Sequence, residues 1–322
     1  MASVLKQKYF HDEAAAFAAL EAIMWPEGPT CPHCGACDRI NRLQGVKDKR
    51  GNIRLGLWKC YHCRSQITVR KGTVFESSHI KLHQWFQAAF LMSSSEKGVS
   101  ANQLHRTLGC TLKTAWFVAH RLREAMRPGK PSLLGGVGRI VEAHTTYVGG
   151  KEKNKHMKKR KAENIGGMGK EILHALVERQ GRVRSHHVPS VNGATLRPIL
   201  FGNADKGSSL MTDTAGGYLH LGKAFANHEM VDHGALEYVR YPEDGEPIHS
   251  NTVEGVFSIL KRGIIGTYHH VSRKHLHRYL SEFDFRYNNR IANGVDDIGR
   301  TVAMMKGAEG KRLTYRVIRS AA

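Results

Sequence analysis

Two pairs of cysteines with identical spacing constrain the N-terminal part of this chain more than any other feature. The pairs are Cys31-Pro-His-Cys34 and Cys60-Tyr-His-Cys63, and 25 residues separate them. Each pair can turn two thiolates toward one ion, and four thiolates complete the tetrahedral shell of Zn²⁺ without leaving a place for water. We therefore expect a structural Zn²⁺ in a zinc ribbon, with a set of unrelated buried thiols as the alternative. The expected β segments of the ribbon are 53–57 and 66–69.

The balance of charges points to a polyanionic partner. Among 322 residues, 49 Lys and Arg outweigh 28 Asp and Glu, which gives a formal net charge of +21. Charge of this sign and size favours nucleic acid as the partner, with an anionic membrane surface as the second candidate. A hydrophobic content of 41% is enough for buried cores and excludes a largely disordered chain.

The sequence offers no segment that would place the chain in a membrane. It contains no run of about 18 uncharged apolar residues, and its first residues lack the apolar core of a secretory signal. We therefore expect no membrane association, and a cytoplasmic location on the nucleoid.

The order of expected elements divides the chain into four segments. They are an N-terminal helix with the zinc ribbon (1–75), a helix-turn-helix DNA-binding region (76–130), an α/β domain (138–300) and a C-terminal tail (301–322). A Pro- and Gly-containing linker at 127–132 precedes the α/β domain. Its strands are expected at 139–148, 172–178, 183–188 and 208–212, and its helices at 194–200, 251–262 and 275–288. Strands mixed with helices in this way indicate the α/β class.

Residues 98–126 have the pattern of a helix-turn-helix. Ser100 can cap a first helix, Gly109 allows a turn, and the second helix carries Lys113 and Arg121 among other basic residues. Such a helix could enter the major groove of DNA, where these two side chains would read base edges. The alternative is an ordinary helical hairpin with a solvated basic face.

A cationic segment follows the first expected strand of the α/β domain. Seven of the eleven residues from Lys151 to Lys161 are Lys or Arg. So many like charges cannot be buried together, so the segment must face solvent or a polyanion. Beside a catalytic strand, Lys151, Lys153 and Lys155 would bind phosphates without reading bases.

Two carboxylates stand out because acidic residues are scarce. Asp213 ends a short apolar segment, and Glu254 begins a helix on which Lys261 lies two turns further along the same face. Carboxylates from a strand end and a helix, brought together, would hold Mg²⁺ and support phosphoryl transfer. Taken singly, Asp213 could equally be a turn residue and Glu254 a surface residue.

The order of these motifs resembles the DDE transposases of zinc-ribbon bacterial insertion sequences, over roughly residues 15 to 290. The most specific motif runs from His249-Ser-Asn-Thr-Val-Glu254 through Lys261 to Ser272, preceded by Thr146-Tyr-Val-Gly-Gly-Lys and Thr212-Asp213. The resemblance implies a ribonuclease-H-like domain in which three acidic residues gather two Mg²⁺ or Mn²⁺ ions to cut and join double-stranded DNA. Asp213 then takes the second acidic position, Glu254 the third, and Lys261 contacts DNA near the cut. It also implies a homo-oligomer that holds the element ends and the target.

The first acidic position departs from the family pattern. The chain reads Val141-Glu-Ala-His-Thr-Thr-Tyr-Val-Gly-Gly150, so His144 replaces the catalytic Asp. An imidazole offers one nitrogen and no negative charge, which suits Zn²⁺ better than Mg²⁺. Glu142 lies on the same strand face, about 6.6 Å away by strand rise, and is the candidate substitute. Two hypotheses follow: a transposase impaired by His144, or an inactive or repurposed transposase that acts as a DNA-binding protein.

Overall fold

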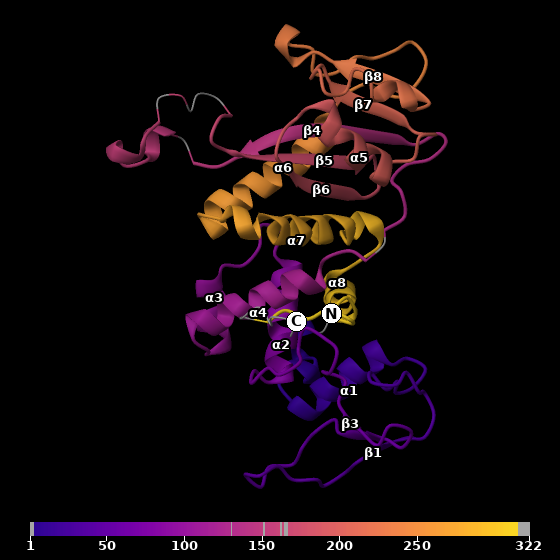
Figure 1. Cartoon of the computed structure of the whole chain (residues 1–322), viewed down its shortest axis with the longest axis vertical. Coiled ribbons are helices and arrows are strands. Elements are labelled where there is room, and N and C mark those ends of the chain that lie inside the picture. The colour runs from indigo at the N-terminus through magenta and orange to yellow at the C-terminus, as the bar shows by residue number, and fades with distance from the viewer. Residues whose placement is uncertain (1–2, 130, 151, 162, 164–166, 315–322) are drawn as a thin grey trace, which may run out of the picture. The chain divides into compact units, whose positions relative to one another are not determined.

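The computed structural model describes residues 3–129, 131–150, 152–161, 163 and 167–314 (Figure 1). The chain forms two compact units: unit 1 comprises Met1–Arg127 and Gly294–Ala322, and unit 2 comprises Pro128–Asn293. The first boundary falls within the expected linker at 127–132. The expected ribbon segment, 1–75, and residues 76–127 of the expected helical segment belong to the same unit, unit 1. None of the helices formed by the described residues is long and apolar enough to cross a membrane.

The helices of unit 1 include one that the sequence analysis missed. They are α1 (Glu13–Met24), α2 (Leu82–Ser94), α3 (Ala101–Leu108), α4 (Leu112–Ala125) and α8 (Asp297–Lys306). Helix α8 lies where we expected the end of the α/β domain and a tail. Asp296 caps it by accepting a hydrogen bond from the Gly299 amide, and it packs on α2, where the hydroxyls of Ser93 and Thr301 are 3.1 Å apart. The part of the tail at 301–306 is therefore helical, and Thr301, Met304 and Met305 of this part are buried.

Three short antiparallel strands form the ribbon, in the order β1 (Ile40–Arg42), β2 (Trp58–Cys60) and β3 (Gln66–Ile67). The segment expected at 53–57 contributes only a bridge at Ile53, and the strand begins one residue after it. Glu21 of α1 fixes the ribbon to the helices, because its carboxylate accepts hydrogen bonds from Trp58 Nε1, at 2.9 Å, and from Arg42.

A five-stranded sheet forms the centre of unit 2. Its strands are β4 (Ile140–Val148), β5 (Glu171–Glu178), β6 (Val183–Val188), β7 (Ser209–Asp213) and β8 (Asn227–Val231), in the order β6-β5-β4-β7-β8. The pairs β6–β5 and β5–β4 are antiparallel, whereas β4–β7 and β7–β8 are parallel. The chain turns from β5 to β6 at Gln180, which has a positive φ.

Helices cover both faces of this sheet. Helix α5 (Gly193–Asn203) packs through Leu196 and Leu200 on the face that carries Val141 and Ala143. Helices α6 (Asn251–Gly263) and α7 (Leu276–Asn288) pack on the opposite face, against apolar residues of β5 and β6. Because side chains alternate along a strand, Glu142 and His144 of β4 point to the α6 face. These two residues thus lie on the sheet face that is covered by the helix carrying Glu254.

Candidate functional site

The register of β4 and β7 brings His144 and Asp213 together. Ala143 is aligned with Thr212 in this parallel pair, so the next residues along both strands lie side by side. Nδ1 of His144 is 3.1 Å from Oδ2 of Asp213, although it makes no aligned hydrogen bond with any described residue. The ends of parallel strands are where open α/β sheets place their ligands. The two residues that the resemblance assigns to the first and second acidic positions therefore lie side by side.

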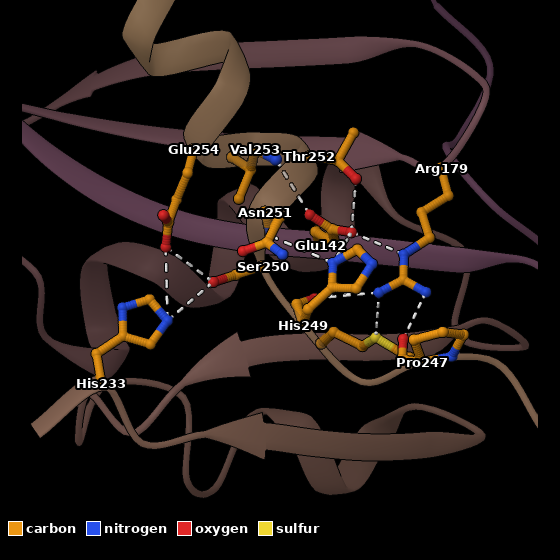
Figure 2. Close-up of polar contacts among 11 residues, drawn as sticks. Glu142, Arg179, His233, Pro247, His249, Ser250, Asn251, Thr252, Val253 and Glu254 are labelled. Atoms are coloured by element: carbon orange, nitrogen blue, oxygen red, sulfur yellow. Dashed lines mark hydrogen bonds and ion pairs between the residues drawn. The ribbon is translucent and has the colours of Figure 1, made fainter. Parts of the chain in front are cut away.

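Glu254 faces the same region from α6, beside a histidine that the sequence analysis missed (Figure 2). Oε1 of Glu254 is 3.5 Å from Nε2 of His233 and accepts a hydrogen bond of 3.1 Å from the Ser250 hydroxyl. His233 follows β8, which pairs with β7 so that Val231 is aligned with Asp213. The ring centroids of His144 and His233 are 6.0 Å apart. Each carboxylate of the candidate site thus has its own imidazole neighbour.

These histidines influence the charge of Asp213. Burial disfavours the ionised carboxyl, but the contact with His144, the Ala215 amide and the charge of His233 outweigh it. As a result, the pKa of Asp213 lies below its ordinary value. The carboxylate is ionised at neutral pH and is available as a ligand or hydrogen-bond acceptor.

Three polar side chains contact one another on the α5 face of the sheet, behind the candidate site. The Tyr218 hydroxyl is 3.1 Å from Nδ1 of His174 and 3.2 Å from the hydroxyl of Thr145. Burial is the main cause that lowers the pKa of His174 to about 3, with smaller contributions from His186 and His144. The imidazole is therefore neutral in the folded chain, and this group of side chains adds no charge behind the site.

Glu142 is fully buried and has partners outside the pair formed by His144 and Asp213 (Figure 2). Its carboxylate accepts hydrogen bonds from Arg179 Nε at 2.7 Å, the Thr252 hydroxyl at 2.8 Å and the Val253 amide at 3.0 Å. The sequence analysis correctly placed Glu142 on the face that carries His144. In this structure, however, the carboxylate is directed to the start of α6, where three donors already occupy it, and this geometry does not favour the substitute role.

The four cysteines Cys31, Cys34, Cys60 and Cys63 converge in unit 1. Their sulfur atoms all lie within 4.8 Å of one another, with the Cys31–Cys63 pair at 3.6 Å and the Cys34–Cys60 pair at 3.7 Å. The fifth nearby thiol, that of Cys37, is exposed and stands outside this cluster. The arrangement is that of a closed tetrahedral site and fits a structural Zn²⁺.

Two family models match the parts of the chain that contain these two sites. Residues 11–66 match the transposase zinc-ribbon domain, and residues 133–288 match the ISXO2-like transposase domain. The chain therefore contains both a transposase zinc-ribbon domain and an ISXO2-like transposase domain. A relative of the transposase, an uncharacterized protein in transposable element ISH50 of Halobacterium salinarum, is 27% identical over 290 residues. These residues cover 87% of the present chain and 92% of that protein.

The transposase domain also contains a cleft of about 870 Å³ beyond the end of β4. Lys261 lines it together with Lys153, Gly149 and Gly150, so two of the predicted DNA-binding residues share one surface. Burial, together with the nearby charge of Lys170, lowers the pKa of Lys261, and Glu254 opposes that shift. Lys155 forms an ion pair of 2.6 Å with Glu152, and Lys151 lies outside the described residues.

In unit 1 of the transposase, the two predicted base-reading residues differ in position. Helices α3 and α4 are separated by Gly109 in the left-handed conformation, and Lys113 is exposed in the first turn of α4. Arg121 is only 7% exposed, donates from Nε to the Leu313 carbonyl at 3.1 Å and lies over the Phe117 ring. The prediction for Arg121 is corrected on this geometry, because its guanidinium packs inside unit 1 and does not present itself to a groove.

The side chains that meet where β4 and β7 end do not match the ligands that a pair of Mg²⁺ ions requires. Mg²⁺ takes oxygen ligands, and a bridging carboxylate normally offsets the repulsion between two such ions. The imidazole of His144 lies where the resemblance implies that carboxylate, and its buried Nδ1 has no hydrogen-bond partner among the described residues. Asp213 and Glu254 remain as the two oxygen donors. The site that the transposase family implies is therefore incomplete in this chain.

Proposed function

We propose that this chain is a DNA transposase that binds element ends and carries a ribonuclease-H-like domain in which His144 impairs Mg²⁺-dependent cleavage and strand transfer. The matches to the two transposase domain models support the transposase assignment. A mixed sheet of three antiparallel strands extended by two parallel ones supports the ribonuclease-H-like assignment. The observation that carries the proposal is the 3.1 Å approach of His144 Nδ1 to Asp213, at the position of the missing acid.

The proposed impairment is electrostatic. Two divalent ions bring four positive charges, and the family pattern counters them with three carboxylates. With His144 in place, Asp213 and Glu254 alone supply negative charge. A protonated His144 would also neutralise Asp213, and a neutral one offers a single nitrogen. At least one of the two ions should therefore bind weakly.

We propose that DNA binding is divided between the two units. In unit 1, the exposed first turn of α4 with Lys113 has the position from which recognition helices contact bases. In unit 2, Lys153 and Lys261 line one cleft and would bind phosphates of the element end or target. The net charge of +21 favours this partner. A homo-oligomer assembled on two DNA ends is the expected state.

The test is a cleavage and strand-transfer assay on the element's own ends, with the unaltered chain beside His144→Asp. We expect the unaltered chain to cleave poorly in Mg²⁺ or Mn²⁺ and the variant to be faster by orders of magnitude. Asp213→Asn in both backgrounds is the control and should abolish cleavage. Robust Mg²⁺-dependent cleavage by the unaltered chain would contradict the impairment.

The second candidate function is a DNA-binding protein without cleavage activity. The observation that favours it is that each carboxylate of the site already has an imidazole neighbour, His144 or His233. It predicts normal binding to element ends and no gain of cleavage in His144→Asp. The cleavage assay of His144→Asp separates the two candidates, and a filter-binding titration run alongside it checks that element ends are still bound.

A further inference from the structure

The start of α6 lacks the local cap that its sequence offers. Ser250 occupies the N-cap position, where a serine hydroxyl commonly accepts a hydrogen bond from the third amide of the helix. Here the Ser250 side chain makes no such bond. Its hydroxyl instead donates to Oε1 of Glu254 at 3.1 Å and lies 3.3 Å from Nε2 of His233. Ser250, the residue best suited to cap the helix, thus contacts Glu254 and His233 of the candidate site instead.

Glu142 replaces the missing cap from a different element. Its Oε2 accepts the Val253 amide, which is the third amide of α6, at 3.0 Å, and its Oε1 accepts the Thr252 hydroxyl at 2.8 Å. A carboxylate at this position also interacts favourably with the positive end of the helix. Because β4 supplies the cap, the Ser250 hydroxyl is available to Glu254.

Arg179 extends this arrangement to the segment that leads into α6 (Figure 2). Its Nε donates to Glu142 at 2.7 Å, and its terminal nitrogens donate to the carbonyls of Pro247 at 2.7 Å and His249 at 3.2 Å. His249 Nδ1 is also 3.3 Å from Glu142 Oε1. A buried carboxylate and an arginine therefore hold both the approach to α6 and its first turn.

We propose that Glu142 and Arg179 are positioning residues that hold the first turn of α6, and with it Glu254, in place for the reaction. Glu142 takes the Val253 amide so that Ser250 can orient the Glu254 carboxylate. This inference rests on the proposed function and assigns Glu142 a role other than that of a substitute metal ligand.

Glu142→Gln is the informative variant, because it preserves shape and removes one acceptor. If the amide oxygen keeps the Arg179 bond, the amide nitrogen faces the N–H of Val253, and two donors then oppose each other. We expect Val253 to exchange its amide hydrogen about fivefold faster, the equivalent of a lost helix cap. In a crystal structure of this variant, the first turn of α6 should shift, and the contact between the Ser250 hydroxyl and Glu254 should be lost. Neither measurement depends on cleavage activity.

The kinetic test is made in the His144→Asp variant, which we expect to cleave DNA. There, Glu142→Gln should lower kcat about 10- to 100-fold with little change in KM for DNA, because the substrate still binds while a reacting group is misplaced. Ser250→Ala should lower kcat as well while leaving the Val253 amide protected. Together these results separate orientation of Glu254 from stability of the helix.

Glu13→Gln is the matched control. Glu13 caps α2 in unit 1 in the same manner, accepting the amides of Leu82 at 2.7 Å and His83 at 3.1 Å. Its replacement should speed exchange at the start of α2 and leave kcat unchanged.

Three results would overturn the inference: unchanged exchange of Val253 in Glu142→Gln, faster exchange with an unchanged kcat, or loss of residual metal-dependent cleavage in Glu142→Gln while Ser250 keeps its contact with Glu254. The last result would identify Glu142 as a ligand. If His144→Asp gains no cleavage, the proposed function fails, and exchange and the crystal structure still decide on the cap.

Discussion

The buried His174 should make the stability of unit 2 depend on pH. This side chain is fully buried, and burial lowers its pKa from 6.5 to about 3. Between these values the unfolded chain binds a proton that the folded chain excludes. Stability must therefore fall as the pH drops below the unfolded pKa. From pH 7 to pH 5 the expected loss from this one residue is about 2 kcal/mol.

His174→Asn isolates this contribution. The Asn carbonyl oxygen can take the place of Nδ1 as acceptor for Tyr218, whereas Nε2 of His174, which the variant removes, has no partner among the described residues. The variant cannot gain a proton, so unit 2 should lose about 2 kcal/mol less than the unaltered chain over the same interval. Other groups also titrate here, since burial lowers the pKa of His186 and raises that of Asp284 to about 6. The contribution of Asp284 cancels in the comparison, and that of His186 cancels apart from its small electrostatic coupling to His174.

The assay must report on unit 2 alone. All four tryptophans precede residue 128, so their fluorescence follows unit 1. Urea titrations at the two pH values should therefore be followed by amide hydrogen exchange of peptides from β5 and β6. The exposed His220, replaced by Asn, is the control and should behave like the unaltered chain. Equal pH dependence in His174→Asn and the unaltered chain would refute the reasoning.

Two further predictions concern metal and DNA. Cys60→Ser combined with Cys63→Ser should lose the single Zn²⁺ and unfold residues 26–75, because the metal supplies much of the folding free energy of so small a module; zinc retained in metal analysis would contradict this. Neutralising Lys153 and Lys155 should weaken binding to all DNA sequences and flatten its salt dependence, whereas Lys113→Ala should affect element ends more than random DNA. If Lys113→Ala lowered the affinity for element ends and for random DNA equally in a binding titration, this would argue against base recognition by α4.

The sequence predicted those parts of the fold that depend on local pattern. The apolar strands β4 and β5 and the cysteine spacing are examples, because strand alternation and ligand geometry act over a few residues. Strand β8 was missed because Asn-His-Glu-Met-Val lacks a clear alternation, and it becomes a strand through its pairing with β7. His233 was missed with it, since only this pairing brings the end of β8 beside Asp213.

Long-range contacts account for the other differences. A helical pattern correctly placed Arg121 on α4 and could not reveal that its partner is the carbonyl of Leu313, close to the other end of the chain. Strand alternation likewise gave the face of Glu142 and left its partners unknown. The identity of a buried charge's partner depends on tertiary structure, which neither periodicity nor spacing encodes.

The return of α8 to the N-terminal helices means that unit 2 is an insertion in the sequence of unit 1. During synthesis, residues 1–127 leave the ribosome before the helix that completes their core, and all of unit 2 is made in between. Until then the surface of α2 around Ser93 has no cover from Thr301, Met304 and Met305. A chain stopped at residue 293 would thus have a complete unit 2 and an N-terminal unit whose core is still open, so translation itself would set the order in which the two units finish folding.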